Sequence, residues 1–284
     1  MRFALVGNER LEAKPELKGA LCPCCLNPVT AKCGEQRIHH WAHKSKRTCD
    51  SWWEPETEWH RAWKSKFPAE WQEFIRSDDQ TGEKHIADVC TGHGLVLEFQ
   101  HSAIKSEERI SREQFYKNMV WVVDGDRLKR DYPRFLKEAE TFRYINGTGF
   151  YLVPFPDECF STTWLESSVP VVFDFLGDTP VISPQDDMRE LLWCLLPGRA
   201  GRYAVLAHIM RNEFLARTLN HPQLFQEPAN RIVDILAKLI QQEQAQRAAI
   251  LLQRANRGVF TRVTIKRSVG RKNQQSYGRG TRRF

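Results

Sequence analysis

Residues 86–100 of this 284-residue chain have the sequence IADVCTGHGLVLEFQ, which decides the predicted fold. Two apolar segments, 86–89 and 95–100, flank a glycine-containing turn and predict a β-hairpin. Side chains alternate between the two faces of a strand, so Glu98 and Gln100 point to the same face. Asp88 interrupts the first apolar segment. We therefore expect Asp88 and Glu98 to converge from neighbouring strands.

Such a pair of acids indicates a cation site. Burying two like charges together costs several kcal/mol unless a cation or a proton compensates them. Oxygen ligands with spare positions for water and phosphate suit Mg²⁺ or Mn²⁺, which can activate water and stabilise the charge that develops on a phosphate. The alternative is a solvent-facing strand edge that carries ordinary acids.

The segments around the hairpin predict an α/β core. A helical pattern begins near Pro55, a residue that is favoured in the first turn of a helix. A second helical piece is expected at residues 69–75, a further helix at 107–117, and a buried strand of continuous apolar type at 119–124. Helix, hairpin, helix and strand in this order are typical of an α/β fold.

The second half of the chain has weaker patterns. Residues 150–153 and 169–173 predict strands, and from Asp186 the pattern becomes helical, most clearly over residues 232–240. The last stretch is rich in glycine and arginine and predicts a flexible tail, in which residues 262–266 alternate enough for a short strand.

Three polar residues in the first predicted helix share one face. Glu56, His60 and Lys64 are spaced four apart, which stacks them along a helix. Such a stripe is usually solvated. Beside Asp88 and Glu98, however, it predicts a functional constellation.

The distribution of charge indicates a polyanionic partner. The 42 basic and 35 acidic residues give a net charge of +7. The last 41 residues contain 11 of the basic residues and no acid, so the rest of the chain, with 31 basic and 35 acidic residues, is mildly acidic. A cationic tail gains affinity for nucleic acid by releasing condensed counterions. The alternative is a solvated tail that aids solubility. The candidate nucleic-acid-binding residues in the tail are Arg262, Lys266, Arg267, Arg271 and Lys272.

The chain has neither a long apolar run nor a signal peptide in its first residues, so we expect a soluble, cytoplasmic protein without membrane contact.

The N-terminal cysteines and histidines predict a zinc site. Cys22 and Cys25 form one pair with a two-residue spacer, and His40 and His43 form another. Zn²⁺ takes thiolates and imidazoles tetrahedrally, and short spacers let each pair reach one ion. Nothing requires an open coordination position, so we expect a structural ion in a small β-rich module, which begins with two short strands at residues 2–6 and 9–13 around a Gly-Asn turn. Four more residues are close enough in sequence to compete as ligands: Cys24, Cys33, His39 and Cys49.

Several motifs together resemble one known family, the competence protein CoiA-like family. The resemblance covers about residues 1–125, under half of the chain. The matching stretches are Cys22-Pro-x-Cys25, His40-Trp-Ala-His43, Glu56-Thr-x-x-His60-x3-Lys64, Ala87-Asp-Val89, Glu98-Phe-Gln-His-Ser102, Arg112-x3-Tyr116 and Val120-Trp-Val-Val-Asp124.

The resemblance implies an N-terminal zinc-binding module joined to a PD-(D/E)XK nuclease domain. That domain is a restriction-endonuclease-like mixed sheet flanked by helices. Asp88 and Glu98 would hold the divalent ion, and Glu56 would be the acid of the first helix. Gln100 occupies the position where many such nucleases have lysine. Because an amide carries no positive charge and is no base, His60 or Lys64 would supply the base or cation.

Arg112 and Tyr116, one helical turn apart, would clamp phosphate or stack near the site. The alternative is a helix that packs Phe115 inward and leaves both residues at the surface.

The domain prediction has four parts: a zinc module at 1–50, a nuclease-like core at 51–147, a mixed and then helical domain at 148–257, and a basic flexible tail at 258–284. The helical region would build its own core, a homodimer face or a contact with a protein partner.

Three functional hypotheses follow. The first is a Mg²⁺- or Mn²⁺-dependent deoxyribonuclease that processes incoming or foreign DNA in transformation, recombination or defence against phage. The second is a DNA-binding or adaptor protein with a nuclease fold and weak or no activity, in keeping with Gln100. The third and weakest is a zinc-dependent hydrolase, which the thiolate-rich cluster disfavours.

Overall fold

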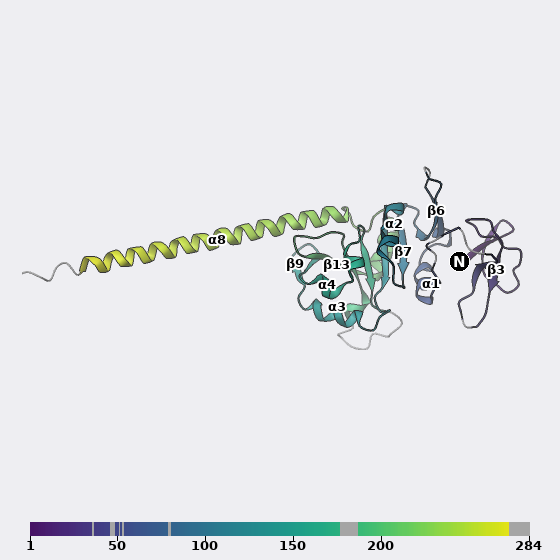
Figure 1. The fold of residues 1–284 in the computed structure, drawn as a ribbon, viewed down its shortest axis with the longest axis horizontal. Coiled ribbons are helices and arrows are strands. Elements are labelled where there is room, and N and C mark those ends of the chain that lie inside the picture. The colour runs from purple at the N-terminus through teal and green to yellow at the C-terminus, as the bar shows by residue number, and fades with distance from the viewer. Residues whose placement is uncertain are drawn as a thin grey trace, which may run out of the picture. The chain divides into compact units, whose positions relative to one another are not determined.

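The computed structural model describes residues 1–35, 37–45, 49–50, 52, 54–78, 81–176 and 187–272, without the side chains of residue 187 and residues 256–272. Its contacts divide the chain into two units, Met1–Asp234 and Ile235–Phe284. Figure 1 shows the ribbon with its elements labelled.

The N-terminal module consists of two small antiparallel sheets. Strands β1 (Phe3–Val6) and β2 (Glu9–Glu12) form a hairpin, as the sequence predicts, and β3 (Val29–Lys32) pairs with β4 (His40–His43). Its core is small and centres on the buried Trp41, whose indole nitrogen donates to the carbonyl oxygen of Leu11 at 2.9 Å. A core of this size suggests that the module needs a further source of stability, for which a metal is the common solution.

The second part is built on one nine-stranded mixed sheet. The strand order is β5-β6-β7-β8-β11-β12-β13-β10-β9, in which β7, β8 and β11 are parallel and every other neighbouring pair is antiparallel. The bounds are β5 Gln72–Ser77, β6 Lys84–Cys90, β7 Val96–Gln100, β8 Met119–Asp124, β9 Arg143–Ile145, β10 Phe150–Val153, β11 Val171–Asp174, β12 Leu191–Leu195 and β13 Ala204–Met210.

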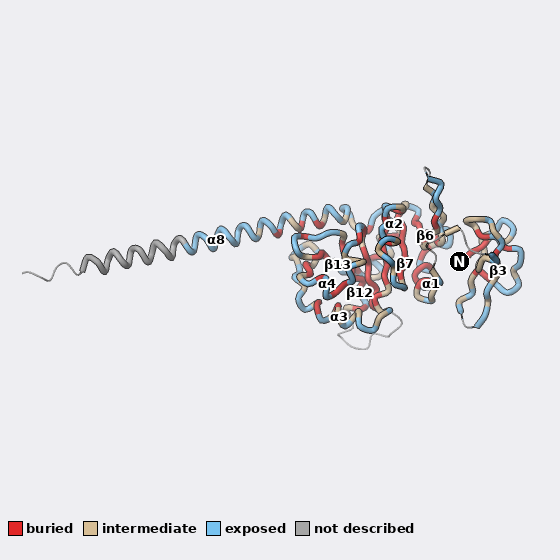
Figure 2. The backbone as a smooth tube through the Cα atoms, in the orientation of Figure 1, coloured by how far each residue is buried: buried red, intermediate tan, exposed pale blue. Residues whose placement is uncertain are grey.

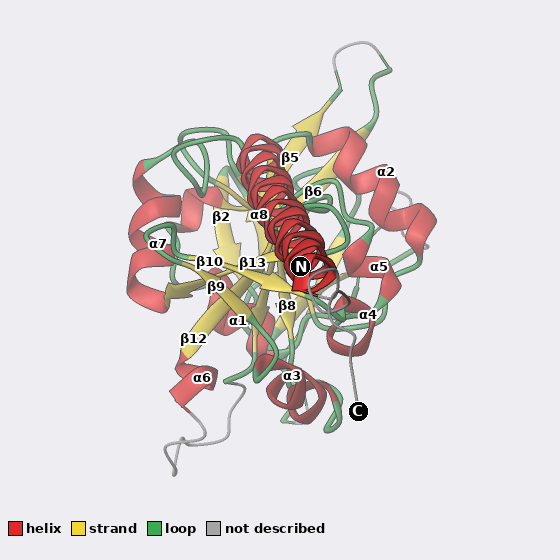
Figure 3. Ribbon diagram, turned by 90° about the vertical axis from the view of Figure 1, so that its left-hand side faces the viewer, coloured by secondary structure: helices red, strands yellow, loops and turns green. Residues whose placement is uncertain are grey.

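Helices cover both faces of this sheet (Figure 3). On one face α1 (Glu58–Lys64) and α7 (Arg211–Asn220) pack together, because Trp63 of α1 lies against Phe99 of β7 and Phe214 of α7. The helices on the other face are α2 (Ser106–Tyr116), α3 (Asp131–Ala139), α4 (Pro156–Cys159) and α5 (Thr162–Leu165). The expected mixed sheet flanked by helices is therefore present.

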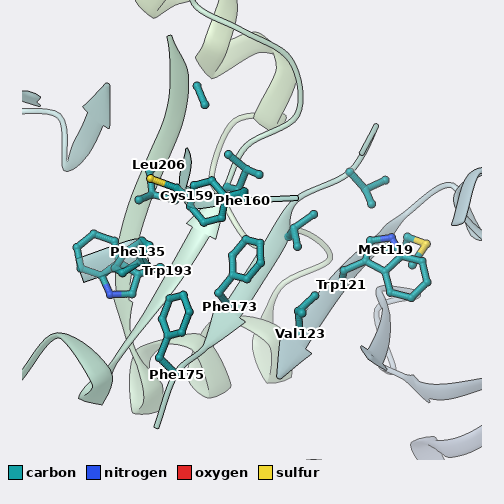
Figure 4. Close-up of a cluster of buried hydrophobic side chains, with 14 of the residues drawn as sticks. Met119, Trp121, Val123, Phe135, Cys159, Phe160, Phe173, Phe175, Trp193 and Leu206 are labelled. Carbon is teal, nitrogen blue, oxygen red and sulfur yellow. The ribbon is translucent and has the colours of Figure 1, made fainter. Parts of the chain in front are cut away.

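A large hydrophobic cluster of described residues lies under this second group of helices. Trp121 of β8 contacts Trp164 of α5, and Phe135 of α3 contacts Trp193 of β12, with ring centroids 5.6 and 5.1 Å apart. Buried residues follow the strands of the large sheet in Figure 2, and Figure 4 shows the aromatic side chains of the cluster. The expected boundary at 147/148 falls inside the β9–β10 hairpin, so the regions on both sides of it share one sheet.

Two segments differ from the sequence prediction. Residues 69–75, predicted as helix, form a short 3-10 turn (η1, Ala69–Trp71) followed by β5, because this segment pairs with β6. The helical pattern predicted from residue 186 begins with the short α6 (Asp187–Glu190) and continues in α7 and in the helix that contains residues 232–240, but β12 and β13 interrupt it and enter the sheet. A short apolar run such as 191–196 fits a buried strand as well as a helix, and pairing with distant strands decides between them.

The described residues of the C-terminal unit belong to one helix. Helix α8 spans Ala229–Lys272, so residues 262–266 are helical and not the predicted short strand, and the expected tail from 258 continues the helix through Lys272. No proline interrupts the sequence after Pro228, which lets the helical pattern of residues 232–240 continue. Within the described residues, no helix is both long and apolar enough to cross a membrane.

Candidate metal centre and candidate active site

One group of thiols and an imidazole gathers in the N-terminal module. Among the described residues, Cys22, Cys25, His43 and Cys49 form the one group of three or more such ligands whose donor atoms all lie within 4.8 Å of one another. The Sγ atoms of Cys22 and Cys49 are 3.9 Å apart, and His43 Nε2 lies 3.3 Å from Cys25 Sγ and 3.7 Å from Cys49 Sγ. Three sulfurs and one nitrogen thus form a compact set.

These distances fit a tetrahedral zinc ion. Zn–S bonds of about 2.3 Å and Zn–N bonds of about 2.0–2.1 Å place neighbouring ligand atoms about 3.6–3.8 Å apart. Burial raises the pKa of the Cys22 thiol to about 12, so this thiol stays protonated unless a cation compensates its charge. The group can therefore hold zinc.

The local backbone explains why the two cysteines of the first pair meet. The amide of Leu26 donates to the carbonyl oxygen of Cys22, and the amide of Cys22 donates to that of Asn27, both at 2.9 Å. Leu26 adopts a left-handed conformation with φ 56°, which closes this turn. Both sulfurs then lie on one side of a knuckle.

His40 does not belong to this group, contrary to the prediction. His40 and His43 both lie on β4, where side chains alternate, so residues three apart point to opposite faces. His40 Nδ1 instead lies 2.8 Å from the carbonyl oxygen of Ile38. Cys49, one of the competing ligands that the sequence left open, takes the fourth position.

A row of acids crosses three neighbouring strands of the large sheet. The β5–β6 register pairs Gln72 with Val89 and so places Glu73 opposite Asp88. The β6–β7 register pairs Val89 with Leu97 and so places Asp88 opposite Glu98. The structure thus brings the two predicted acids together and adds Glu73, which sequence reasoning missed.

The hairpin ladder ends at this row. In place of the next backbone pairing, the amide of Asp88 donates to Glu98 Oε1 at 3.2 Å, and the amide of Phe99 donates to Asp88 Oδ2 at 3.0 Å. Each carboxylate thus binds the backbone of the opposite strand. The strands separate here, and a pocket opens between them.

This pocket has an excess of negative charge. Among the described residues, its lining includes six carboxylates but one lysine, Lys64, and one arginine, Arg112, and the free space for water-sized groups is about 70 Å³. The six acids are Asp50, Glu54, Glu56, Glu73, Asp88 and Glu98. Asp88 is the most accessible of the central acids, with 26% of its side chain exposed. We call this space the acid pocket.

Lys64 lies at the centre of the acids. Its Nζ atom is 2.5 Å from Glu56 Oε1, 3.4 Å from Glu73 Oε1 and 3.7 Å from Asp88 Oδ1. Burial alone would lower the pKa of this amine, but the three carboxylates raise it above its ordinary value. Lys64 is therefore a permanent cation next to Asp88.

Glu73 is held in an unusual conformation. Its backbone has φ 46°, a left-handed value that costs glutamate about 1–2 kcal/mol. The carboxylate accepts hydrogen bonds from the amides of Arg2 and Phe3 at 2.6 and 3.0 Å. Burial alone would raise the pKa of Glu73. Lys64 and these amides have the larger, opposite effect, and the pKa falls below its ordinary value, to about 2. Glu73 thus links the N-terminal module to the acid pocket.

Glu56 lies outside the helix on which the sequence placed it. Helix α1 begins at Glu58 with Thr57 as its N-cap, so Glu56 belongs to the extended segment before the helix. The N-cap is favoured here because Thr57 and His60 form a capping box. Glu56 still reaches Lys64 and pairs with Arg61 at 2.5 Å.

His60 presents a donor and not a base. The Thr57 amide donates to His60 Nδ1 at 3.3 Å, so Nδ1 is unprotonated and the proton of the neutral ring is on Nε2. Burial lowers the pKa of His60, which outweighs the opposing effect of Asp88 and keeps the ring neutral at pH 7.

Glu98 is buried between a like charge and a cation. Burial and the neighbouring charge of Asp88 raise its pKa to about 8, although Arg112 acts in the opposite direction. Arg112 Nη1 donates to Glu98 Oε2 at 2.9 Å. The pair of acids is thus undercompensated, which favours a bound cation.

Gln100 has a different surrounding from the one expected. Its side chain is buried, and its amide nitrogen donates to Glu54 Oε1 at 2.8 Å and to the Ser102 carbonyl oxygen at 3.1 Å. Ser102 Oγ donates to the same carboxylate at 2.6 Å. Glu54 is therefore a further acid that sequence reasoning missed; its position two residues before Glu56 is the signal that would have identified it.

Arg112 and Tyr116 are both buried. They therefore do not lie on an exposed helix face, and they are not free to clamp a phosphate. Arg112 also donates to the Trp52 carbonyl oxygen at 2.6 Å and pairs with Glu108. Both residues line the acid pocket. Arg112 supports Glu98 and neutralises part of its charge.

His101 was also missed. Its Nδ1 atom lies 2.6 Å from Asp124 Oδ2, and its ring centroid is 6.0 Å from that of His60. The basic residues expected to bind nucleic acid in the tail are located on α8, and their side chains lie outside the described part of the chain.

Comparison with known proteins gives one match. Residues 6–51 match the family model described as the N-terminal domain of competence protein CoiA. The match confirms the resemblance over this module, which contains Cys22, Cys25, His43 and Cys49. No curated protein and no solved structure matches the chain significantly.

Proposed function

We propose that this chain, a CoiA-like protein by its residues 6–51, is a metal-dependent nuclease that hydrolyses phosphodiester bonds in DNA. The main support is the row of Glu73, Asp88 and Glu98 across three strands, in a pocket whose carboxylates outnumber its lysine and arginine by six to two. A pocket of this charge binds cations. Phosphodiesters are anions, so a cation in the pocket is what makes such a substrate acceptable there.

The acids fit a hard divalent ion. Asp88 and Glu98 offer carboxylate oxygens, the donor type that Mg²⁺ and Mn²⁺ prefer, and two protein ligands leave positions for water and phosphate. When bound, the ion would polarise the phosphate and lower the pKa of water. Arg112 keeps Glu98 oriented through the 2.9 Å hydrogen bond.

Lys64 and His60 supply the groups that Gln100 lacks. The ammonium of Lys64, 3.7 Å from Asp88, would stabilise negative charge on the phosphate. His60 Nε2 carries a proton and would donate a hydrogen bond to a phosphate oxygen or to the leaving group. Gln100 holds Glu54 in place and needs no charge for this.

The zinc module has a structural role in this proposal. Its four ligands are all supplied by the protein, so no coordination position is open for a substrate. The amides of Arg2 and Phe3 bind Glu73, and Glu73 contacts Lys64. A folded module therefore helps to hold Glu73, and through it Lys64, in place in the acid pocket.

The biological role that we propose is the processing of incoming or foreign DNA, in transformation, recombination or defence against phage. It is supported by the name of the matched family, which concerns competence. The substrate is cytoplasmic DNA.

The decisive experiment is a cleavage assay. The purified protein with Mg²⁺ or Mn²⁺ is expected to degrade linear or single-stranded DNA, and Asp88→Ala and Glu98→Gln should each lower the rate about 10²–10³-fold, as removal of a group that stabilises the transition state does. Glu107→Gln, which removes an exposed acid from α2, is the matched control with unchanged activity. Circular dichroism melts check that all three variants fold.

Two outcomes contradict the proposal. Cleavage that survives both Asp88→Ala and Glu98→Gln excludes the acid pocket as the site. If no metal supports cleavage while DNA still shifts on a gel, the protein is a DNA-binding or adaptor protein with this fold, which the absence of an ammonium at Gln100 favours.

A further inference from the structure

A second cavity lies beside the acid pocket, at the carboxyl ends of the parallel strands. β7, β8 and β11 run in the same direction, and ligands of α/β sheets bind outside the carboxyl ends of such strands. Gln100, the last residue of β7, lines the acid pocket, and the next residue, His101, lines the second cavity. Its free space is about 250 Å³, several times that of the acid pocket.

The floor of this cavity is aromatic. Phe160, Phe173 and Phe175 line it and are almost fully buried (Figure 4). Phe160 and Phe173 stack with ring centroids 4.8 Å apart. Trp164 of α5 lines the cavity as well and is half-buried. Because the three phenylalanines are almost fully buried, the half-buried Trp164 offers the accessible ring face above them, and every nucleobase can stack on such an aromatic side chain.

The rim of the cavity is basic. Arg127 and Arg130 line it and are exposed, and Arg134 is held by the carbonyl oxygens of Asp157 and Glu158 at 3.3 and 3.1 Å. Two acids, Asp124 and Asp131, also line it. The three guanidinium groups outnumber these two acids and favour an anion such as phosphate.

His101 connects the two spaces. Its Nδ1 atom is held by Asp124 at 2.6 Å, which fixes the ring, and a third of its side chain remains exposed. Its ring centroid is 6.0 Å from that of His60, which lines the acid pocket. A ligand that extends from one space to the other passes this imidazole.

From this arrangement we infer that the second cavity receives one nucleotide of the DNA strand that is cut in the acid pocket. The base packs on the aromatic floor, the rim arginines bind the phosphate, and His101 contacts the phosphate between the two spaces. A base can enter the cavity only when it is unpaired. The substrate is therefore single-stranded or locally unwound DNA. This inference rests on the proposed function and specifies its substrate class.

The test compares binding of a single-stranded oligonucleotide and a blunt duplex of equal length, by fluorescence anisotropy with Ca²⁺ in place of Mg²⁺ or Mn²⁺, so that a hard divalent ion can occupy the acid pocket. Two variants probe the cavity: Arg127→Ala with Arg130→Ala removes rim charge, and Ala103→Trp fills the space from an exposed position in its lining. The control, Lys129→Ala with Lys137→Ala, removes two exposed charges from the same segment outside the lining. Thermal melts confirm that each variant is folded.

We expect the wild type to prefer the single strand, and each cavity variant to lose about tenfold or more of that affinity, as loss of base stacking does. The duplex affinity should change less than about twofold, and the control should lose little and equally for both DNAs. In the cleavage assay, the cavity variants should cut single-stranded DNA more slowly.

Several results would overturn the inference: no binding of either DNA by the wild type, equal losses for both DNAs, or unchanged single-strand affinity in the cavity variants. Competition by free deoxynucleoside monophosphate that is as strong as that by the oligonucleotide would identify a site for free nucleotides instead. The binding assay and the cleavage assay fail independently. If no metal supports cleavage but the cavity variants still lose single-strand affinity selectively, the nuclease proposal is wrong and the single-strand site remains.

Discussion

At the residue scale, the acid pocket depends on how its lysine and arginine are shared among its carboxylates. Lys64 contacts Glu56, Glu73 and Asp88, and Arg112 contacts Glu98. Lys64 is almost fully buried, so removing it would leave the half-buried carboxylates of Glu56, Glu73 and Asp88 without their shared ammonium. Such a change costs more than the loss of the pair itself, because the remaining charges stay desolvated.

Glu73 gives this network a characteristic pH dependence. Its pKa is lowered from 4.5 to about 2 in the folded protein, so its stabilising effect is complete above the unfolded pKa and is lost as the pH falls from about 5 to 2. At about 1.4 kcal/mol per pKa unit, the loss is about 3 kcal/mol. Urea unfolding at pH 6 and pH 2.5 should show this extra loss in the wild type but not in Glu73→Gln.

Glu70→Gln is the control for this measurement, because Glu70 is exposed on the neighbouring 3-10 turn. It should follow the wild-type pH dependence. If Glu73→Gln loses as much unfolding free energy between pH 6 and pH 2.5 as the wild type does, Glu73 is not the source of the acid sensitivity.

The zinc ligands are the second prediction at this scale. The protein should contain about one zinc ion per chain, and Cys49→Ser should lose most of it, because a sulfur of the tetrahedral set is removed. His40→Ala should retain the zinc, since His40 lies on the opposite face of β4. Plasma mass spectrometry of the purified variants measures the metal content.

Cys33→Ser is the matched control, as Cys33 is a half-buried thiol of the same module outside the ligand group. Loss of zinc in His40→Ala together with its retention in Cys49→Ser would restore the ligand set that the sequence suggested.

At the element scale, the parallel strands β8 and β11 approach each other closely where they end. The amide of Gly125, the residue after β8, donates to the carbonyl oxygen of Asp174, the last residue of β11, at 2.8 Å. A Cβ atom at Gly125 would lie 2.5 Å from the ring of Phe175. Only glycine leaves space for this aromatic side chain, which forms part of the floor of the second cavity.

Gly125→Ala should therefore destabilise the protein by about 1–3 kcal/mol, the usual cost of overpacking a core. Gly34→Ala is the control, because a Cβ atom there meets nothing within 4 Å. It should change the stability by less than about 0.5 kcal/mol. Equal midpoints of urea unfolding for both variants would show that Phe175 moves aside without cost.

At the scale of the whole molecule, the chain separates a mildly acidic body from a basic C-terminus. Deleting residues 258–284, which contain eight basic residues and no acid, should lower DNA affinity and flatten its salt dependence. Each lost phosphate contact reduces the slope of log K against log salt by about 0.7–0.9. Affinities at several salt concentrations give this slope.

A full-length variant serves as the control for the deletion. It replaces Arg262, Lys266, Arg267, Arg271 and Lys272 by glutamine and should flatten the slope in the same direction. An unchanged slope in both proteins would leave the C-terminus without a phosphate-binding role.

The sequence alone was sufficient for elements that depend on nearby residues. The β6–β7 hairpin, strand β8, helix α2 and the pairing of β1 with β2 follow from local alternation, turns and apolar runs, and all are present. The opposition of Asp88 and Glu98 could be predicted for the same reason, because a tight turn fixes the hairpin register. The proximity of Cys22 and Cys25 also follows from their two-residue spacer, whereas His43 reaches them from a strand that lies 18 residues further along the chain.

Only the tertiary structure showed which strands pair when they are far apart in the sequence. β5, β12 and β13 are short segments whose apolar patterns do not separate strand from helix, and their neighbours in the sheet decide their structure. Glu73 enters the acid row only because β5 pairs with β6, and Cys49 replaces His40 because β4 points its histidines to opposite faces. His101 meets Asp124, and Arg112 meets Glu98, only when β7, β8 and α2 pack together. A local pattern fixes which side chains share a face, whereas contacts across the molecule depend on which surfaces bury each other, and that is settled by the free energy of the whole fold.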